Sequence, residues 1–253
     1  ALCSDTDESE YSAEISFRTL CDVVTIDEEN IYTEDFEEYE ASSFPDCWTR
    51  DVAYTSYPYV IANSSYTTYS HNGTKAMHMY FYGSANSNVI STPSFTNDIN
   101  TLQVSFFARY SSTNPILEVG VMDQTTFEPV DTIVLTSTYP TNAFTVMFNH
   151  YTGNGNRIAF RITPSGTSSY TSYYTYLDDV TVELIPSCIA PSNVTVIDST
   201  ITTTSALVAW TDNNNEAPAN GWTLLVNGEE VLADANPFPL TGLTASTTYT
   251  VKV

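Results

Sequence analysis

The chain has 253 residues, with 30 Asp and Glu against 7 Lys and Arg, so its formal net charge is -23 at pH 7. A surface this acidic repels nucleic-acid phosphates and anionic lipid headgroups, which argues against both as partners. Hydrophobic residues make up 42% of the chain, enough for a folded core. No apolar run approaches the roughly 18 residues of a membrane-spanning helix.

Motifs of the common catalytic and metal centres are absent from the sequence. The three histidines lack metal-site spacing, and there is no nucleophile elbow and no glycine-rich phosphate loop. The four cysteines (Cys3, Cys21, Cys47 and Cys188) are too scattered for a zinc site. They allow three disulfide pairings, and the composition suits an exported protein in which they oxidise.

Alternating runs of β-branched and aromatic residues, separated by Gly, Pro, Asn and Ser, predict strands along most of the chain. In one run Leu102, Val104 and Phe106 fall on one face, while Gln103 and Ser105 fall on the other. This alternation is typical of half-buried antiparallel strands, so the sequence predicts an all-β fold built from sandwiches. The clearest runs are residues 101–110, 116–122, 130–135, 144–148, 157–162 and 176–184.

The composition of the predicted strands changes after residues 185–188 (IPSC), where a proline ends a long strand, and this predicts a domain boundary. Thr- and Val-rich strands follow, with Trp210 in one of them and a Leu-x-x-x-Thr-x-Tyr-x-Val pattern over residues 243–251. These features resemble a fibronectin type III domain. The resemblance implies an immunoglobulin-like β-sandwich over residues 187–253 that lacks its last strand.

The acidic residues 1–20 are similar to the missing end of such a domain, with an alternating strand over residues 13–19 (AEISFRT). We therefore expect the chain to be a piece of a tandem array, with its first residues left over from a preceding module. Residues 13–19 are predicted to complete the fibronectin-like sandwich, within the chain or by strand exchange with a neighbour. The alternative is a frayed acidic tail.

Residues 21–186 carry an ordered series of short motifs: residues 32–37 (YTEDFE), 44–48 (FPDCW), 71–77 (HNGTKAM), 102–110, 117–123 and 176–180 (YLDDV). This order resembles the cleaved-adhesin, MAM-like jelly roll of gingipain-type haemagglutinin regions. The resemblance implies a jelly-roll sandwich that is a non-catalytic part of a larger secreted or cell-surface protein. The implied roles are adhesion and the binding of carbohydrate or matrix proteins. The alternative is a purely structural spacer that presents a catalytic domain outside this chain.

Strand alternation places Asp178 on the face of Val180 and Val182, where a carboxylate is costly unless it is paired or binds a metal. With few cationic side chains in the chain, calcium is a suitable partner because it prefers oxygen ligands. The jelly-roll resemblance implies a structural calcium in this region. The alternative is a strand end capped by hydroxyl or backbone N–H groups. The predicted ligands are Asp35, Glu37, Asn72, Asp178 and Asp179.

The dense acidic run over residues 34–40 could be mistaken for a glycosidase pair. Hydrolysis needs two carboxylates on opposite sides of a cleft, one of them with a raised pKa. A run on a single segment is more typical of a solvated face or a cation site. The sequence therefore predicts no enzyme.

Two Ser/Thr-rich stretches hold many of the 18 tyrosines. Tyrosine rings with a polar rim suit sugar faces and protein contacts, although the same rings can simply pack over sheet faces. The predicted ligand-binding residues are Tyr54, Tyr57, Tyr59, Tyr170 and Tyr173.

Cys21 and Cys47 lie on either side of the strand expected over residues 35–37, and we predict a disulfide between them. Such a bond would stabilise the domain by roughly 2–4 kcal/mol. Cys3 and Cys188 then either pair, if residues 13–19 complete the second domain, or remain free thiols.

Overall fold

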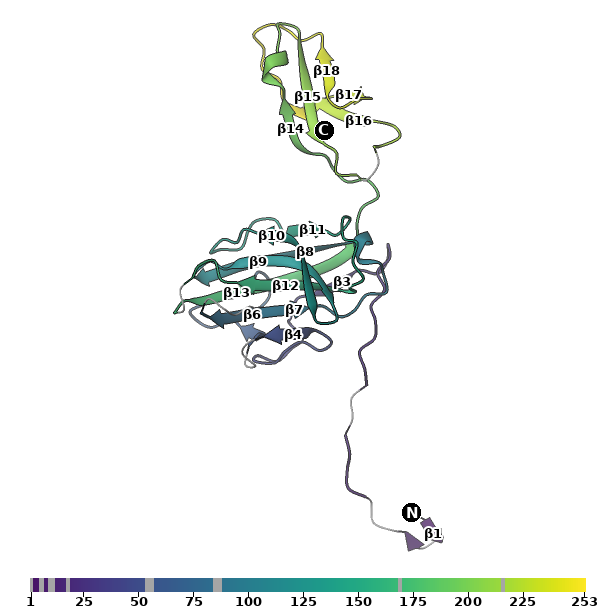
Figure 1. Ribbon diagram of the computed structural model, residues 1–253, viewed down its shortest axis with the longest axis vertical. Helices are drawn as coiled ribbons and strands as arrows, with labels where there is room; N and C mark the ends of the chain where they lie inside the picture. Colours follow the sequence, from purple (N-terminus) through teal and green to yellow (C-terminus); the bar gives the residue numbers. More distant parts are fainter. Residues whose placement is uncertain are drawn as a thin grey trace. The chain divides into compact units, whose positions relative to one another are not determined.

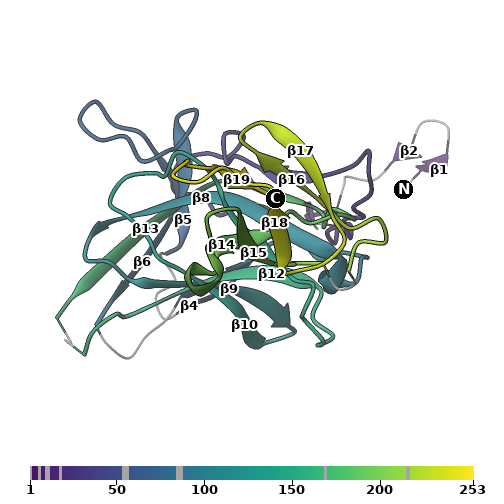
Figure 2. The same ribbon diagram turned by 90° about the horizontal axis from the view of Figure 1, so that it is seen from above.

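The computed structural model of the chain describes residues 2–4, 7–8, 12–16, 19–52, 57–83, 88–167, 170–214 and 217–253. Its regular structure is β-strand apart from two short 3-10 turns, η1 (Ile99–Thr101) and η2 (Asp198–Thr200), which confirms the all-β prediction. None of the helices in these residues is long and apolar enough to cross a membrane. The chain divides into two compact units, Ala1–Leu184 and Ile185–Val253 (Figures 1 and 2).

The first unit is a two-sheet sandwich of the jelly-roll type, in which most successive strands alternate between the sheets. The six-stranded sheet contains β3 (Tyr32–Glu34), β5 (Tyr59–Ala62), β6 (Lys75–Tyr82), β8 (Leu102–Ser112), β11 (Phe144–Met147) and β13 (Ser172–Leu184). The five-stranded sheet contains β4 (Thr49–Val52), β7 (Asn88–Ser91), β9 (Ile116–Asp123), β10 (Thr126–Ile133) and β12 (Arg157–Thr163). Their orders are β11-β8-β13-β6-β5, with β3 paired to β13, and β10-β9-β12-β7-β4. The successive pairs β5–β6 and β9–β10 each stay within one sheet.

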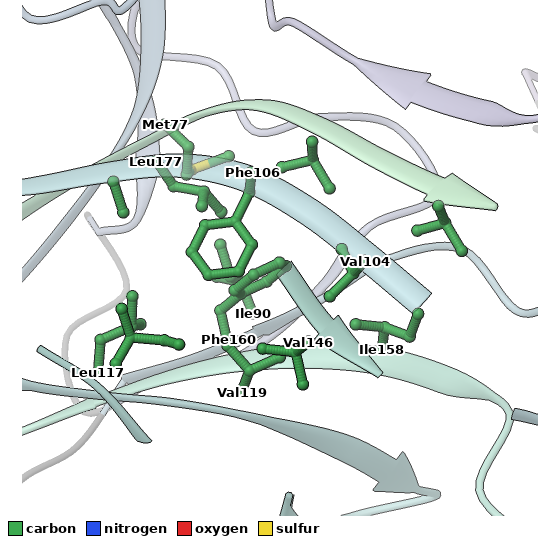
Figure 3. Close-up of a cluster of buried hydrophobic side chains, with 14 of the residues drawn as sticks. Met77, Ile90, Val104, Phe106, Leu117, Val119, Val146, Ile158, Phe160 and Leu177 are labelled. Atoms are coloured by element: carbon green, nitrogen blue, oxygen red, sulfur yellow. The ribbon is translucent and has the colours of Figure 1, made fainter. Parts of the chain in front are cut away.

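The core of this unit fills the space between the two sheets. Along β8, Leu102, Val104 and Phe106 point inward and are fully buried, as the alternation predicts. The Phe106 ring meets the Phe160 ring of β12 edge to face at 5.0 Å between centroids (Figure 3). Because side chains alternate along a strand, the other half of β6, β8 and β13 faces away from this core.

A β-bulge interrupts the longest strand, β13. Asp178 pairs with Phe107 and Thr181 pairs with Ser105, so β13 has one extra residue at this point, and Asp179 adopts φ +49°. The bulge reverses the alternation, so Leu177 and Val180 both belong to the core. The sequence-based placement of Asp178 on the inward face is therefore wrong: Asp178 lies on the outward side, although it is fully buried there.

The strand expected over residues 35–37 is a turn that follows β3. The Glu34 carboxylate accepts the Phe36 N–H (2.8 Å) and the Asp35 carboxylate accepts the Glu37 N–H (3.1 Å). Phe36 adopts φ +61° and packs, fully buried, against Trp48. Local carboxylate-to-backbone bonds thus compete successfully with strand pairing.

Cys21 and Cys47 form the predicted disulfide, with their Cα atoms 5.6 Å apart. It ties the segment before β3 to the residues that lead into β4. Cys188 is a free, exposed cysteine in the described part of the chain.

The second unit packs two three-stranded sheets around a small core that contains Trp210, Leu224 and Leu240. One sheet has the order β14 (Ser192–Val196), β15 (Ser205–Thr211), β18 (Phe238–Thr241), and the other β17 (Glu229–Ala233), β16 (Trp222–Val226), β19 (Val251–Lys252). The resemblance of this unit to fibronectin type III domains stays a prediction.

The N-terminal residues contain a short pair of strands, β1 (Leu2–Ser4) and β2 (Asp7–Glu8). Of the strand predicted over residues 13–19, the described residues 13–16 and 19 are exposed and form no strand, while residues 17 and 18 lie outside the described part.

Candidate functional site

The outward side of the six-stranded sheet carries a continuous patch of rings, which we call the aromatic face. It consists of Tyr57, Tyr59, His78, Tyr80, Tyr174 and Tyr176. In the strand register, Tyr59 of β5 pairs with His78 of β6, His78 with Tyr176 of β13, and Tyr176 with Arg109 of β8. One row of side chains therefore crosses four neighbouring strands.

The rings of the aromatic face contact one another closely. Tyr80 lies 4.8 Å from Tyr174 and 4.7 Å from Tyr57, measured between ring centroids. Tyr57 precedes β5 and also contacts Tyr59 at 5.0 Å. Rings at these separations gain roughly 0.5–1.5 kcal/mol per pair beyond their burial, so these contacts stabilise the face.

His78 sits at the centre of the aromatic face and is only 4% exposed. Its ring stacks on Tyr176 at 5.1 Å and meets the edges of Tyr57 and Tyr59 at 5.4 and 5.2 Å. Neither ring nitrogen has a hydrogen-bond partner among the described residues. Burial lowers the pKa of His78 to about 4, so the imidazole is neutral at physiological pH.

Arg109 extends the face toward the next strands. Its guanidinium lies over the ring of Tyr176 at 4.7 Å and over that of Tyr139 at 5.4 Å. It also donates to the Thr68 carbonyl oxygen (2.7 Å), while the Tyr139 hydroxyl donates to the Tyr69 carbonyl oxygen (2.6 Å). These contacts fix the loop between β5 and β6 against the sheet.

An acidic site, which we call the acidic turn, lies on the same side of the sheet and contains His71, Asn72, Asp178 and Asp179. Asp178 Oδ2 accepts the backbone N–H groups of His71 (2.7 Å) and Asn72 (3.3 Å). Asp179 Oδ2 lies 2.6 Å from His71 Nδ1 and accepts from Asn72 Nδ2 at 2.9 Å. The bulge in β13 turns both carboxylates toward this one turn.

Glu37 holds the next residues of the same turn. Its carboxylate accepts the N–H groups of Thr74 (2.7 Å) and Lys75 (2.6 Å) and the Thr74 hydroxyl (2.8 Å). Burial alone would raise the pKa of Glu37, but these hydrogen bonds lower it. A Cβ atom at Gly73, which adopts φ +59°, would lie 2.5 Å from Glu37 Oε1, so the close approach requires glycine.

The structure thus brings Glu37, Asn72, Asp178 and Asp179 to one turn, whereas the Asp35 carboxylate caps its own turn. Carboxylate and amide oxygens are the kind of ligand that calcium prefers. Within the described residues, however, no three His, Cys, Asp or Glu side chains are placed to hold one metal ion. The carboxylate oxygens instead accept bonds from N–H and O–H donors.

The predicted ligand-binding tyrosines fall into different environments. Tyr57 and Tyr59 belong to the aromatic face, and Tyr170 is 85% exposed. Tyr173 is 1% exposed and stacks on Phe81 in the core, so its assignment to a binding surface is wrong. Tyr54 lies outside the described residues.

His78 and Tyr80 were not among the predicted site residues, because strand β6, which contains both, was not predicted from the sequence. The signal was present in the alternation of residues 75–82 (KAMHMYFY), in which Met77, Met79 and Phe81 enter the core. The intervening side chains then face outward, beside the tyrosines of β13.

Comparison with known proteins gives matches to solved structures alone: no family model matches the chain, and no curated protein is similar to it. A cleaved adhesin domain of Lys-gingipain from Porphyromonas gingivalis has a TM-score of 0.46 at 14% identity, covering 62% of this chain and 99% of that domain. TmCBM61, solved with β-1,4-galactotriose, has a TM-score of 0.40 at 12% identity, and the match covers 60% of this chain and 99% of that one. The glycoside hydrolase domain of Endo-D from Streptococcus pneumoniae has a TM-score of 0.39 at 11% identity, and the match covers 81% of this chain and 32% of that one.

The buried carboxyl of Asp178 predicts a specific pH dependence of stability. Burial raises its pKa from 3.8 to about 7, against the lowering effect of the hydrogen bond from His71. Between about pH 4 and pH 7 the folded protein keeps a proton that the unfolded chain has released. This carboxyl therefore stabilises the fold fully below pH 4 and loses that contribution as the pH rises to about 7.

Asp178→Asn should remove this dependence. In urea unfolding with chelator present, we expect the free-energy difference between wild type and variant to change by roughly 1–3 kcal/mol between about pH 4.5 and 7.5, in favour of the variant at the higher pH. The exposed Asp198→Asn serves as control and should give a constant difference. A constant difference for Asp178→Asn as well would contradict the prediction.

Proposed function

We propose that the first unit binds glycans on the aromatic face, as a non-catalytic adhesion module of a larger protein that acts outside the cell or on its surface. The observation that carries the proposal is the row of Tyr59, His78, Tyr176 and Arg109 across four neighbouring strands. Within the aromatic face, His78 and Tyr176 are each only 4% exposed, and the partly exposed rings of Tyr57, Tyr59, Tyr80 and Tyr174 are the ones a sugar can contact. The Cys21–Cys47 disulfide supports an oxidising environment.

Tyrosine suits this role because its ring packs on the apolar C–H face of a sugar while its hydroxyl bonds to sugar hydroxyls. Burial raises the pKa of Tyr59 to about 12, so this hydroxyl remains a donor at physiological pH. Glu37 and Asp178 accept backbone N–H bonds of the acidic turn instead of facing one another across a cleft. The site therefore favours binding over hydrolysis.

Tyr59→Ala and Tyr174→Ala test the proposal by removing one ring each from the aromatic face. On a glycan array and in titration calorimetry with the glycan that binds best, we expect each variant to lose affinity by roughly 10-fold or more, from about 1–3 kcal/mol per stacked ring. Phe127→Ala truncates a ring on the other sheet and should keep wild-type affinity.

If the wild type and all three variants bind with equal affinity, the ligand does not bind on the aromatic face. Failure of the wild-type chain to bind any glycan or matrix protein would favour the alternative, in which both units are spacers that present a domain outside this chain.

We also propose that calcium binds at the acidic turn and there locks β13 and the segment after β3 to the β5–β6 loop. The proposal is supported by the carboxylates of Glu37, Asp178 and Asp179 and the amide group of Asn72 around one turn, in a chain with a net charge of -23. Bound calcium would supply positive charge to the adjacent carboxylates, and some of their N–H bonds would be exchanged for it. The alternative is that Asp179 is satisfied without a metal, by His71 Nδ1 at 2.6 Å and the Asn72 amide.

Asp179→Asn separates these two possibilities. If calcium binds, we expect it to raise the melting temperature of the wild type by about 5–10 °C at a hundredfold excess over the Kd, relative to chelator, and to raise that of the variant far less. Magnesium at the same concentration is the control, because its stricter geometry should give little effect. Equal shifts for wild type and variant would contradict the site.

We further propose that the second unit is a fibronectin-like sandwich completed by residues 13–19, from the same chain or a neighbour. Strand β19 pairs only with β16 within the described sheet, and an apolar groove of about 400 Å³ is lined by Ile201, Leu243 and Val251 among others. Ile15 is 87% exposed in its own segment. An unpaired sheet edge and an exposed apolar segment are complementary.

Ile15→Asp should disrupt this pairing, because it would place a charge in the groove. In hydrogen exchange of the full chain, we expect slow exchange at Val251 and Lys252 in the wild type and at least tenfold faster exchange in the variant. Leu20→Asp, outside the predicted strand, should match the wild type. Identical exchange in all three proteins would leave residues 13–19 as an acidic tail.

A further inference from the structure

Resting on the glycan-binding function proposed above, we infer that His78 determines which sugars the aromatic face accepts, by hydrogen bonding through its ring nitrogens to a hydroxyl group of a neutral sugar. His78 lies in the centre of the row, between Tyr59 and Tyr176 in register. Its side chain is almost completely buried, and both nitrogens lack partners among the described residues.

An imidazole in this position is costly to the free protein. A buried polar atom without a hydrogen bond destabilises a fold, because it has lost its bonds to water without gaining others. Phenylalanine would fill the same space between Tyr59 and Tyr176 and carry no such penalty. Side chains that are kept at the expense of stability are typical of functional sites.

The chemistry of His78 matches a sugar hydroxyl. A neutral imidazole offers one N–H donor and one nitrogen acceptor, and a hydroxyl group can both accept and donate. Sites that hydrogen-bond a hydroxyl discriminate strongly against ligands that lack it, because the buried polar group is then left unpaired. The partly exposed rings of Tyr59 and Tyr174 beside His78 supply the stacking surfaces for the same sugar.

His78 is 4% exposed, so a neighbouring ring must move before a sugar can reach its nitrogens. The ring of Tyr57 meets the imidazole at 89° between planes and also contacts Tyr80, and Tyr57 lies before β5 and not within the sheet. We therefore infer that the Tyr57 side chain rotates on binding, and such changes are common when partners bind.

The charges around the face select a neutral ligand. Asp179 lies on the same side of the sheet and has a partly exposed carboxylate. The guanidinium of Arg109 is already engaged by the Thr68 carbonyl and the Tyr176 ring. An acidic sugar would therefore meet like charge, in a chain that already carries a net charge of -23.

The experiment compares the full-length wild type with His78→Phe, His78→Gln and the control His150→Phe, whose histidine is exposed on the surface. The probes are neutral β-1,4-linked oligosaccharides of galactose, glucose, xylose and mannose, with oligogalacturonate as the acidic counterpart. His78→Phe should raise the melting temperature by about 2–4 °C and weaken binding of the best neutral oligosaccharide by roughly 10- to 100-fold. His78→Gln, which keeps a donor and an acceptor, should recover part of the affinity. His150→Phe should change neither quantity.

Binding by His78→Phe within about twofold of the wild type would overturn the inference and leave the glycan-binding function intact, and so would preferential binding of oligogalacturonate. A wild type that binds none of the probes would overturn both. If His78→Phe does not fold, the ¹⁵N shifts of the wild-type His78 imidazole decide the question. They should move on addition of the neutral oligosaccharide, and unchanged shifts in the bound state would overturn the inference.

Discussion

The bulge at Asp178 and Asp179 is the constraint on which the rest of the first unit depends. Strand β13 pairs with β8, β6 and β3, so it must present apolar side chains to the core along its whole length. The extra residue restarts the alternation, which lets Leu177 and Val180 both pack inward. It also turns two adjacent carboxylates outward, where both accept hydrogen bonds from the β5–β6 loop, Asp178 fully buried and Asp179 partly exposed.

The same alternation that builds the core also builds the aromatic face. Met77, Met79 and Phe81 enter the sandwich, and His78 and Tyr80 are left on its outer side. The polar groups buried on that side at a cost to stability include the carboxyl of Asp178 and the imidazole of His78. One is satisfied by backbone donors and the other has no partner in the described chain, so the two positions suit different roles: holding a loop and binding a ligand.

Prediction from the sequence succeeded where strand alternation or cysteine position carries the signal, and failed where the partner of a particular side chain decides the conformation. The inward residues of β8 and the bond between Cys21 and Cys47 follow the predictions. The strand predicted over residues 35–37 is absent because the carboxylates of Glu34 and Asp35 accept hydrogen bonds from backbone N–H groups two residues further on. An alternating sequence pattern does not reveal such bonds. The prediction that Tyr173 binds a ligand was wrong because Tyr173 occupies an inward position of β13, where its ring packs in the core although the surrounding sequence is rich in Ser and Thr.

The sequence by itself determined the β class of the chain and the change of composition near residue 185, because these depend on residue type and period. The set of acids near the Asn-Gly turn was implied by the resemblance to the jelly-roll family. Only the tertiary structure decided which of these residues meet. A single bulge moved Asp178 from one face of β13 to the other, and strand register, which is set by contacts far apart in the sequence, placed His78 between tyrosines of two other strands.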